Sequence, residues 1–277
     1  MAGRFTKEQM MTMDPIFLRA HLRERVHHTI EHQLIQAMYG ARRPGPTFGD
    51  IVREILEVWE ARGLPSDWPD VKWAQTIFNL AEKAKSGQAI EIPGGYMPQA
   101  LTEEQMKTWN VLLYGRRSYR HWDDRPVPRW MVEKILEAGM WAPSACNLQI
   151  CRFIVMEDPE VLQLFANREF EVEKVKIVVC ADIRAYRDVE WPPPERNKYL
   201  DVGACLQNMA LATHALGLGG CWSTFNAQQI DGIRRYYGLP DHLEVVTYLS
   251  LGWPAEKVMP PSRMAYTDAL LAWSCQK

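Results

Sequence analysis

Two apolar segments in the second half of the chain constrain its fold more than any other feature. Residues 176–181 form an apolar run that is unbroken after Lys176, which is typical of a central strand buried on both faces. Residues 200–216 are apolar nearly all round a helical period, and such a helix is itself buried. Because both segments must be covered by other elements, they predict a small sheet wrapped by helices.

Weaker patterns supply the remaining elements of this region. Strand-forming side chains predict strands over residues 152–156 and 245–251. Helical spacing predicts helices over 128–140 and 227–237, and a capping box at Thr102-Glu-Glu-Gln105 begins a helix that reaches about Tyr114. Helices and strands alternate only sparsely, so the predicted fold class is α+β.

The first hundred residues differ from the rest because they contain helical patterns only. Apolar residues at helical spacing predict helices over 15–39, 49–62 and 70–85. Residues 87–98 are rich in Gly and Pro and read as a linker. The sequence therefore predicts two domains, a helical N-terminal extension over residues 1–100 and an α+β domain over 101–277.

Composition excludes several classes of function. The chain has 277 residues, 47% hydrophobic residues and a net charge of −2, so nothing drives it toward nucleic acid or an anionic membrane. The longest apolar run has the length of a strand, well below the ~18 residues of a membrane span. No secretory signal is recognisable, and six cysteines without a C-x-x-C pair predict free thiols in a reducing cytoplasm.

Three segments contain residues suited to binding a ligand. Arg116-Arg-Ser-Tyr-Arg120 places guanidinium groups and a hydroxyl at a turn, where they could bind a phosphate. Residues 142–149, Ala-Pro-Ser-Ala-Cys-Asn-Leu-Gln, form a loop whose amides suit a heterocycle. The glycines of residues 217–224 would let backbone approach a flat ligand. Each alone could be an ordinary turn, and neither a Rossmann fingerprint nor a P-loop is present.

In combination, these segments resemble the FMN-dependent nitroreductase family. The cationic turn looks like its R-x-S-x-[RK] motif, and residues 142–149 look like its A-P-S-x-x-N-x-Q loop. The helix from Leu206 to the glycines at 217–219 is similar to its central helix, and Leu251-Gly-Trp-Pro254 to its L-G-Y-P strand end. The resemblance covers about residues 103–268. It implies a nitroreductase-like fold and a homodimer with two FMN sites at the subunit interface.

The resemblance also implies a set of FMN-binding residues. Those expected at the phosphate and pyrimidine are Arg116, Arg117, Ser118, Arg120 and Arg263. Those expected from the partner subunit are Pro143, Ser144, Ala145 and Asn147. Those expected near the ring are Asn167, Trp222, Ser223 and Thr224. Ile150 and Cys151 stand where the family usually has Pro-Trp.

The implied reaction is ping-pong hydride transfer from NADH or NADPH, through FMN, to a nitroaromatic, quinone or related conjugated acceptor. No catalytic side chain is expected, because the flavin carries the hydride and Arg120 would give it electrostatic support. Alternatives on the same scaffold stay open. They are a reductive dehalogenase, a flavin destructase, a natural-product oxidase and a non-catalytic flavin-binding protein. The short connection between Val161 and Lys176 argues against the long lid of the deiodinase branch.

Two features of the sequence lie outside the resemblance. His28-Thr-Ile-Glu-His32 matches the H-x-x-E-H pattern of zinc enzymes, but no third ligand is recognisable, so we expect a polar helix face and no metal. The extension is either a cover over the dimer or a device that closes over the flavin and selects the acceptor. In the second case, Trp59, Trp68, Trp73 and Phe78 would offer a stacking surface. Cys146 and Cys151 are expected to be small buried residues without reactive thiols.

Overall fold

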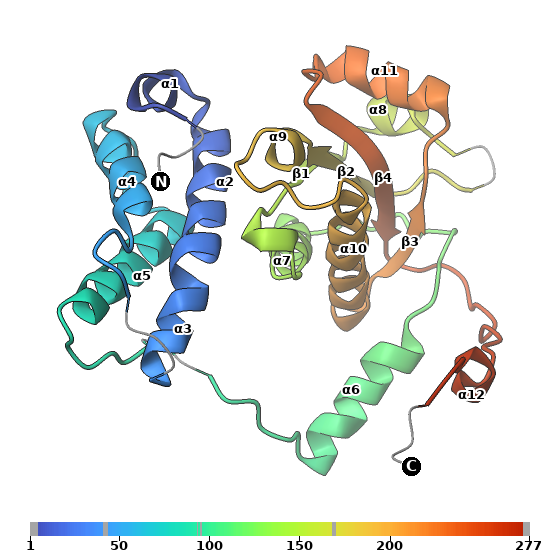
Figure 1. Cartoon of the computed structure of the whole chain (residues 1–277). Coiled ribbons are helices and arrows are strands. Elements are labelled where there is room, and N and C mark those ends of the chain that lie inside the picture. Colours follow the sequence, from blue (N-terminus) through green and yellow to red (C-terminus); the bar gives the residue numbers. More distant parts are fainter. Residues whose placement is uncertain (1–4, 41–43, 93, 95, 168–169, 274–277) are drawn as a thin grey trace.

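A computed structural model describes residues 5–40, 44–92, 94, 96–167 and 170–273 of the chain (Figure 1). Within these residues, four strands form one antiparallel sheet in the order β1-β2-β4-β3. The strands are β1 (Cys151–Met156), β2 (Val175–Asp182), β3 (Gly219–Ser223) and β4 (Leu243–Gly252). The sheet is small and helices cover it, so the predicted α+β class is confirmed.

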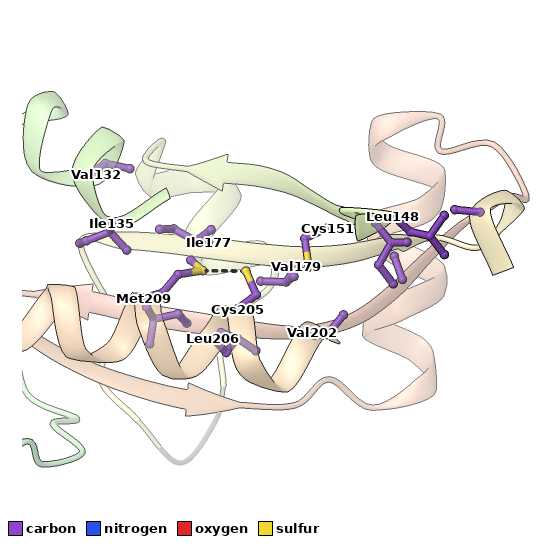
Figure 2. Packing of buried hydrophobic residues seen from close by; sticks show 14 of the residues in the cluster. Val132, Ile135, Leu148, Cys151, Ile177, Val179, Val202, Cys205, Leu206 and Met209 are labelled. Atoms are coloured by element: carbon purple, nitrogen blue, oxygen red, sulfur yellow. Dashed lines mark hydrogen bonds between the residues drawn. The ribbon is translucent and has the colours of Figure 1, made fainter. Parts of the chain in front are cut away.

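The predicted central strand is confirmed, because β2 pairs with β1 on one side and β4 on the other. Its side chains alternate between two cores. Ile177 and Val179 face α10 (Asn197–Ala215) and α7 (Arg129–Met140), and Figure 2 shows this layer. Val178 and Cys180 lie in a second core with α8 (Pro159–Leu164) and α11 (Ala227–Tyr237). Burial on both faces accounts for the unbroken apolar run.

The buried helix over residues 200–216 is confirmed as part of α10. In Figure 2, Cys205, Leu206 and Met209 of α10 face the sheet, and the Cys205 thiol lies 3.7 Å from the sulfur of Met209. The glycines that follow α10 do more than end it, because Gly219 and Gly220 form the first half of β3. The sequence did not predict this edge strand, since glycine is depleted in strands.

The N-terminal helices have a hydrophobic core of their own. The elements are α1 (Lys7–Thr12), α2 (Pro15–Val26), η1 (His27–Glu31), α3 (His32–Met38), α4 (Asp50–Ala61) and α5 (Pro69–Lys85). The long helix predicted over 15–39 corresponds to α2, η1 and α3, which follow one another without a break. Within it, η1 is a π-helical turn. Trp59 is buried in this core with 2% of its surface exposed, so it cannot offer the expected stacking surface.

Helix α2 lies between this core and the sheet (Figure 1). Apart from Arg19, every residue from Phe17 to Val26 is buried. Phe17 and Ala20 pack in the core beneath the sheet, whereas Leu18 packs among the N-terminal helices. One helix thus belongs to both cores, and its polar residues must find partners inside the protein.

Two segments project from this body. Helix α6 (Glu103–Gly115) has the predicted capping box at Thr102 but buries none of its residues. Helix α12 (Tyr266–Ala269) lies in a C-terminal arm, and α6 and α12 are both at the lower edge of Figure 1.

The remaining short elements are η2 (Ala145–Asn147) and α9 (Arg184–Arg187). No helix in the described ranges is long and apolar enough to cross a membrane.

Candidate functional site

The cationic turn after α6 is held against the edge strand β3. Ser118 forms a parallel bridge with Gly220, and the Tyr119 amide donates a 3.2 Å hydrogen bond to the Gly220 carbonyl. A Cβ atom at Gly219 would lie only 2.8 Å from the Tyr119 ring, so this close approach requires glycine. The glycine segment and the arginine segment therefore build one structural unit.

A cavity of about 430 Å³ opens beside this turn. Its polar lining comes from Arg116, Arg117, Ser118, Arg120, Glu256, Lys257 and Arg263. Five of these side chains are cationic and one is a carboxylate. The carboxylate of Glu256 already accepts hydrogen bonds from the backbone amides of Arg120 (2.6 Å) and His121 (3.2 Å). The cavity therefore presents an excess of positive charge, which fits a phosphate dianion.

Five predicted phosphate-side residues thus line one cavity, and two further groups were missed. Lys257 adds a cation that no sequence motif indicated. His214 lies on α10, and its Nε2 is buried without a hydrogen-bond partner among the described residues. A Cβ at Gly115 would lie 2.8 Å from that nitrogen, so His214 faces the start of the turn. A histidine in the last turn of a largely apolar helix was the signal available for it.

None of the predicted ring-side residues is among those that line this cavity. Trp222 lies with Arg116, Arg117 and His214 around a smaller pocket, and 45% of its surface is exposed. Its indole donates a 2.8 Å hydrogen bond to Thr247, which in turn donates to the Ser223 carbonyl. Thr224 follows on the surface.

Asn167 makes a contact of a different kind. Its side-chain amide donates a 3.3 Å hydrogen bond to the hydroxyl of Tyr248, whose ring belongs to the core beneath α8 and α11. Asn167 is absent from the residues that line the cationic cavity. The structure therefore does not bring it together with the phosphate-side residues.

The loop at residues 143–149 is anchored to the beginning of α10. The Asp201 carboxylate accepts hydrogen bonds from the Ser144 hydroxyl and the Ala145 amide, both 3.0 Å long. Beyond Pro143, the loop is unusual in backbone conformation. Cys146, Asn147 and Gln149 all have positive φ, at 50°, 54° and 51°. Such angles are uncommon for residues with a Cβ and persist only where surrounding structure enforces them.

The N-terminal extension supplies part of that enforcement. Arg23 of α2 is 4% exposed and donates hydrogen bonds to the carbonyls of Asn147 (3.0 Å) and Leu148 (2.7 Å). Its guanidinium also pairs with Asp70 of α5, which binds Arg19 as well. Burial lowers the pKa of Arg23 to about 10 against the opposing charge of Asp70. Burial opposes ionisation of Asp70, but the two arginines outweigh it and lower its pKa.

The phosphate turn and the loop lie at opposite ends of α10. Asp201 is in the first turns of the helix and His214 in the last, 13 residues later. At 1.5 Å per residue, the two ends are ~20 Å apart. A single chain therefore does not bring its own loop to its own cationic cavity.

The histidines of the H-x-x-E-H segment are not arranged as that motif requires. His28 points to the loop, where its Nε2 lies 3.3 Å from the Cys146 thiol, while the rings of His32 and His27 meet edge to face. Burial and neighbouring positive groups lower the pKa of His28 to about 4. Cys151 is buried as expected, but the prediction for Cys146 was wrong in part, since it is only half-buried and contacts His28. Burial nevertheless raises the pKa of its thiol.

Comparison with known proteins assigns the chain to a family. The model of the nitroreductase family matches residues 113–194 and 172–253. A protein of Methanothermobacter thermautotrophicus assigned as an NADH dehydrogenase/NAD(P)H nitroreductase is 34% identical over 148 residues, covering 51% of this chain and 74% of its own. A similar assignment in Archaeoglobus fulgidus is 32% identical and covers 53% and 85%.

Solved structures agree with this assignment. A protein of Desulfovibrio desulfuricans, solved with FMN and assigned as a nitroreductase, is 32% identical with a TM-score of 0.52. The likeness covers 60% of this chain and 96% of that one. The chain belongs to the nitroreductase family. The family model's match begins at residue 113, so helices α1 to α5 lie outside it.

Proposed function

We propose that this protein reduces a nitroaromatic, a quinone or a related conjugated acceptor with electrons from NADH or NADPH, by a ping-pong reaction. As a member of its family it is an FMN-dependent NAD(P)H oxidoreductase, like relatives named as NADPH nitroreductase and FMN reductase. The cationic cavity is the observation that supports FMN binding by this chain's own residues. Its five positive side chains and the Ser118 hydroxyl form a donor set suited to the phosphate of FMN.

The residues around the cavity have distinct roles in this proposal. Arg116, Arg117, Ser118 and Arg263 bind the phosphate, with Lys257 adding charge. When bound, FMN supplies the redox chemistry, and the protein supplies position and electrostatics. The backbone of Arg120 is held by its bond to Glu256, and its guanidinium lies over the ring of Phe170 at 4.9 Å, so its charge would give the flavin electrostatic support from this side. Trp222 and the backbone of Ser223 and Thr224 border the ring.

We infer that the working unit is a homodimer. Helix α6 buries nothing within the chain, yet exposes Trp109, Val111 and Tyr114. Trp109 and Trp141 also line an apolar cavity of about 490 Å³ between α6, α7 and α10. A second copy that covers this face would remove a large apolar patch from water. The ~20 Å separation along α10 has the same explanation, because the partner's loop would complete each cavity.

We further propose a role for the extension as a separate helical domain. Arg23 holds two carbonyls of the loop, and Asp70 neutralises that arginine. The extension would therefore fix the loop that the partner's flavin meets, which is a positioning role and more than a cover. The five described cysteines are all free, which supports a reducing, cytoplasmic location.

Steady-state turnover tests the proposed reaction. Oxidation of NADH or NADPH is followed without oxygen while a nitroaromatic or a quinone is varied against the nucleotide. Parallel lines in double-reciprocal plots are expected for ping-pong turnover. Reduction of the flavin with no turnover of either acceptor class would favour a specialised relative, and no consumption of nucleotide would favour a flavin-binding protein.

A further inference from the structure

We propose that His27, His28 and Cys146 form a binding site for a borderline-soft transition-metal ion of the Zn²⁺ class. The three side chains come from the π-turn η1 and from the loop at residues 143–149, which are 118 residues apart in sequence. One ligand atom of each lies within 4.8 Å of the other two. This set differs from the H-x-x-E-H pair, because it uses the adjacent histidines and replaces His32 with a thiol.

The distances suit zinc. The Nε2 of His28 lies 3.3 Å from the Cys146 sulfur. A Zn²⁺ ion with bonds of ~2.3 Å to sulfur and ~2.0 Å to nitrogen, at a tetrahedral angle, separates those two atoms by ~3.5 Å. Two imidazoles and one thiolate are ligands that this class of ion prefers. Three protein ligands would leave one position for water.

His27 also has the outer partner typical of a metal ligand, and His28 lies near a second carboxylate. A ligating histidine usually donates its second ring N–H to a carboxylate, which fixes its orientation. The Nδ1 of His27 lies 2.9 Å from Glu31, and the Nδ1 of His28 lies 3.7 Å from Glu24. Glu31 thus orients the ring of His27, and the ring of His28 presents its Nε2 to the Cys146 thiol.

The backbone and the surrounding charges are compatible with a cation. Single π-turns occur frequently at functional sites, and η1 places both histidines and Glu31 in one turn. Arg25 is the nearby positive charge, but it pairs with two carboxylates, those of Glu24 and Glu190. The side chain of His27 is 30% exposed, so an ion can reach the site from solvent.

Such an ion would cross-link the extension to the loop that Arg23 also holds. Cys146 has φ of 50°, a conformation that must be enforced by its surroundings. Coordination would be a third interaction that stabilises this loop, in addition to the hydrogen bonds of Asp201 and of Arg23. Binding requires the thiolate, so the proton of the Cys146 thiol passes to the buffer as the sulfur–metal bond forms.

Calorimetric titration of the full-length protein tests the site. The protein is first freed of metal with a chelator and dialysed, and Zn²⁺ is then added at pH 7 in two buffers of different ionisation enthalpy. We expect one Zn²⁺ per chain and release of about one proton. Cys146→Ser is expected to weaken binding at least tenfold and to abolish the proton release.

Two further variants make the result decisive. His27→Asn is expected to weaken binding as Cys146→Ser does. Because His27 is only partly buried, the variant is expected to fold, and circular dichroism would verify this. His32→Asn removes the other histidine of the H-x-x-E-H pattern and is expected to leave binding unchanged. No saturable binding by the wild type, or binding that survives Cys146→Ser and is lost in His32→Asn, would overturn the proposal.

Discussion

The buried pair of Arg23 and Asp70 gives the sharpest test of how the extension is attached. The Arg23 side chain is 4% exposed and that of Asp70 is 9% exposed, so neither charge is solvated by water. Asp70→Asn keeps the shape but removes the negative charge, and Arg23 becomes a buried cation without a counter-ion. Breaking a buried pair from one side costs about 3–5 kcal/mol. Because Arg23 keeps its two carbonyl partners, we expect the lower end of that range.

The free energy of unfolding, measured by urea denaturation, is the direct readout. A loss of about 3 kcal/mol corresponds to roughly 6 °C in Tm for a chain of this size. Asp67→Asn is the matched control, because Asp67 is an exposed carboxylate just before the same helix, and it should change stability by less than about 0.5 kcal/mol. A cost for Asp70→Asn no larger than for the control would refute the electrostatic account of the attachment.

The dependence on pH gives an independent check on the same pair. The pKa of Asp70 is lowered in the folded state, so its stabilising contribution is present above the pKa of the unfolded chain, near 4. It is lost as the pH falls through the lower folded pKa. The stability difference between wild type and Asp70→Asn should therefore be constant at neutral pH and shrink only below about pH 4.

Three further predictions concern the flavin site and the dimer. Arg116→Ala should weaken FMN binding roughly 10- to 100-fold, measured by fluorescence titration, because a charge-assisted bond is lost. The control variant Arg129→Ala, at an exposed position, should bind FMN as the wild type does. Equal FMN affinity of Arg116→Ala and the wild type would exclude the cavity as the phosphate site. Asp201→Asn should lower the flavin content of the purified protein while leaving the cationic turn intact, because it loosens the loop. An unchanged ratio of flavin to protein absorbance would argue against a role for the loop. Trp109→Glu should shift the protein toward monomer in sedimentation experiments and release FMN, and a dimer that persists would place the interface elsewhere.

Local signals in the sequence predicted much of the fold. Helix α2 begins at Pro15, the first residue of the helix predicted over 15–39, with Asp14 as its cap, and the predicted capping box at Thr102 begins α6. Gly238, with φ of 60°, ends α11 one residue beyond the predicted helix. The unbroken apolar run within residues 176–181 also identified the central strand, because a strand buried on both faces has apolar residues at successive positions.

The unpredicted features depend on contacts between distant residues. Edge strand β3 is rich in glycine, and its Gly219 makes room for Tyr119, a hundred residues earlier. Nothing local indicates that Cys146 has positive φ, since the loop is enforced by Asp201 and by Arg23 from the extension. Such long-range hydrogen bonds produce no periodic pattern in the sequence, so the spacing of residue types could not predict them.

The candidate site was predictable in part for the same reason. Five phosphate-side residues were found, because four come from one short segment with a recognisable motif. Lys257 and His214 were missed, since each is a single polar residue whose position depends on how the C-terminal arm and α10 meet the turn. The π-turn at His27 was missed because helical spacing alone does not distinguish it from an ordinary turn.

The visible absorption spectrum of the purified protein during anaerobic titration with NADH or NADPH tests the central claim most directly. We expect a bound flavin spectrum that bleaches on addition of one or both nucleotides and returns when a quinone is added. A protein that neither carries FMN nor takes it up from solution would contradict the account.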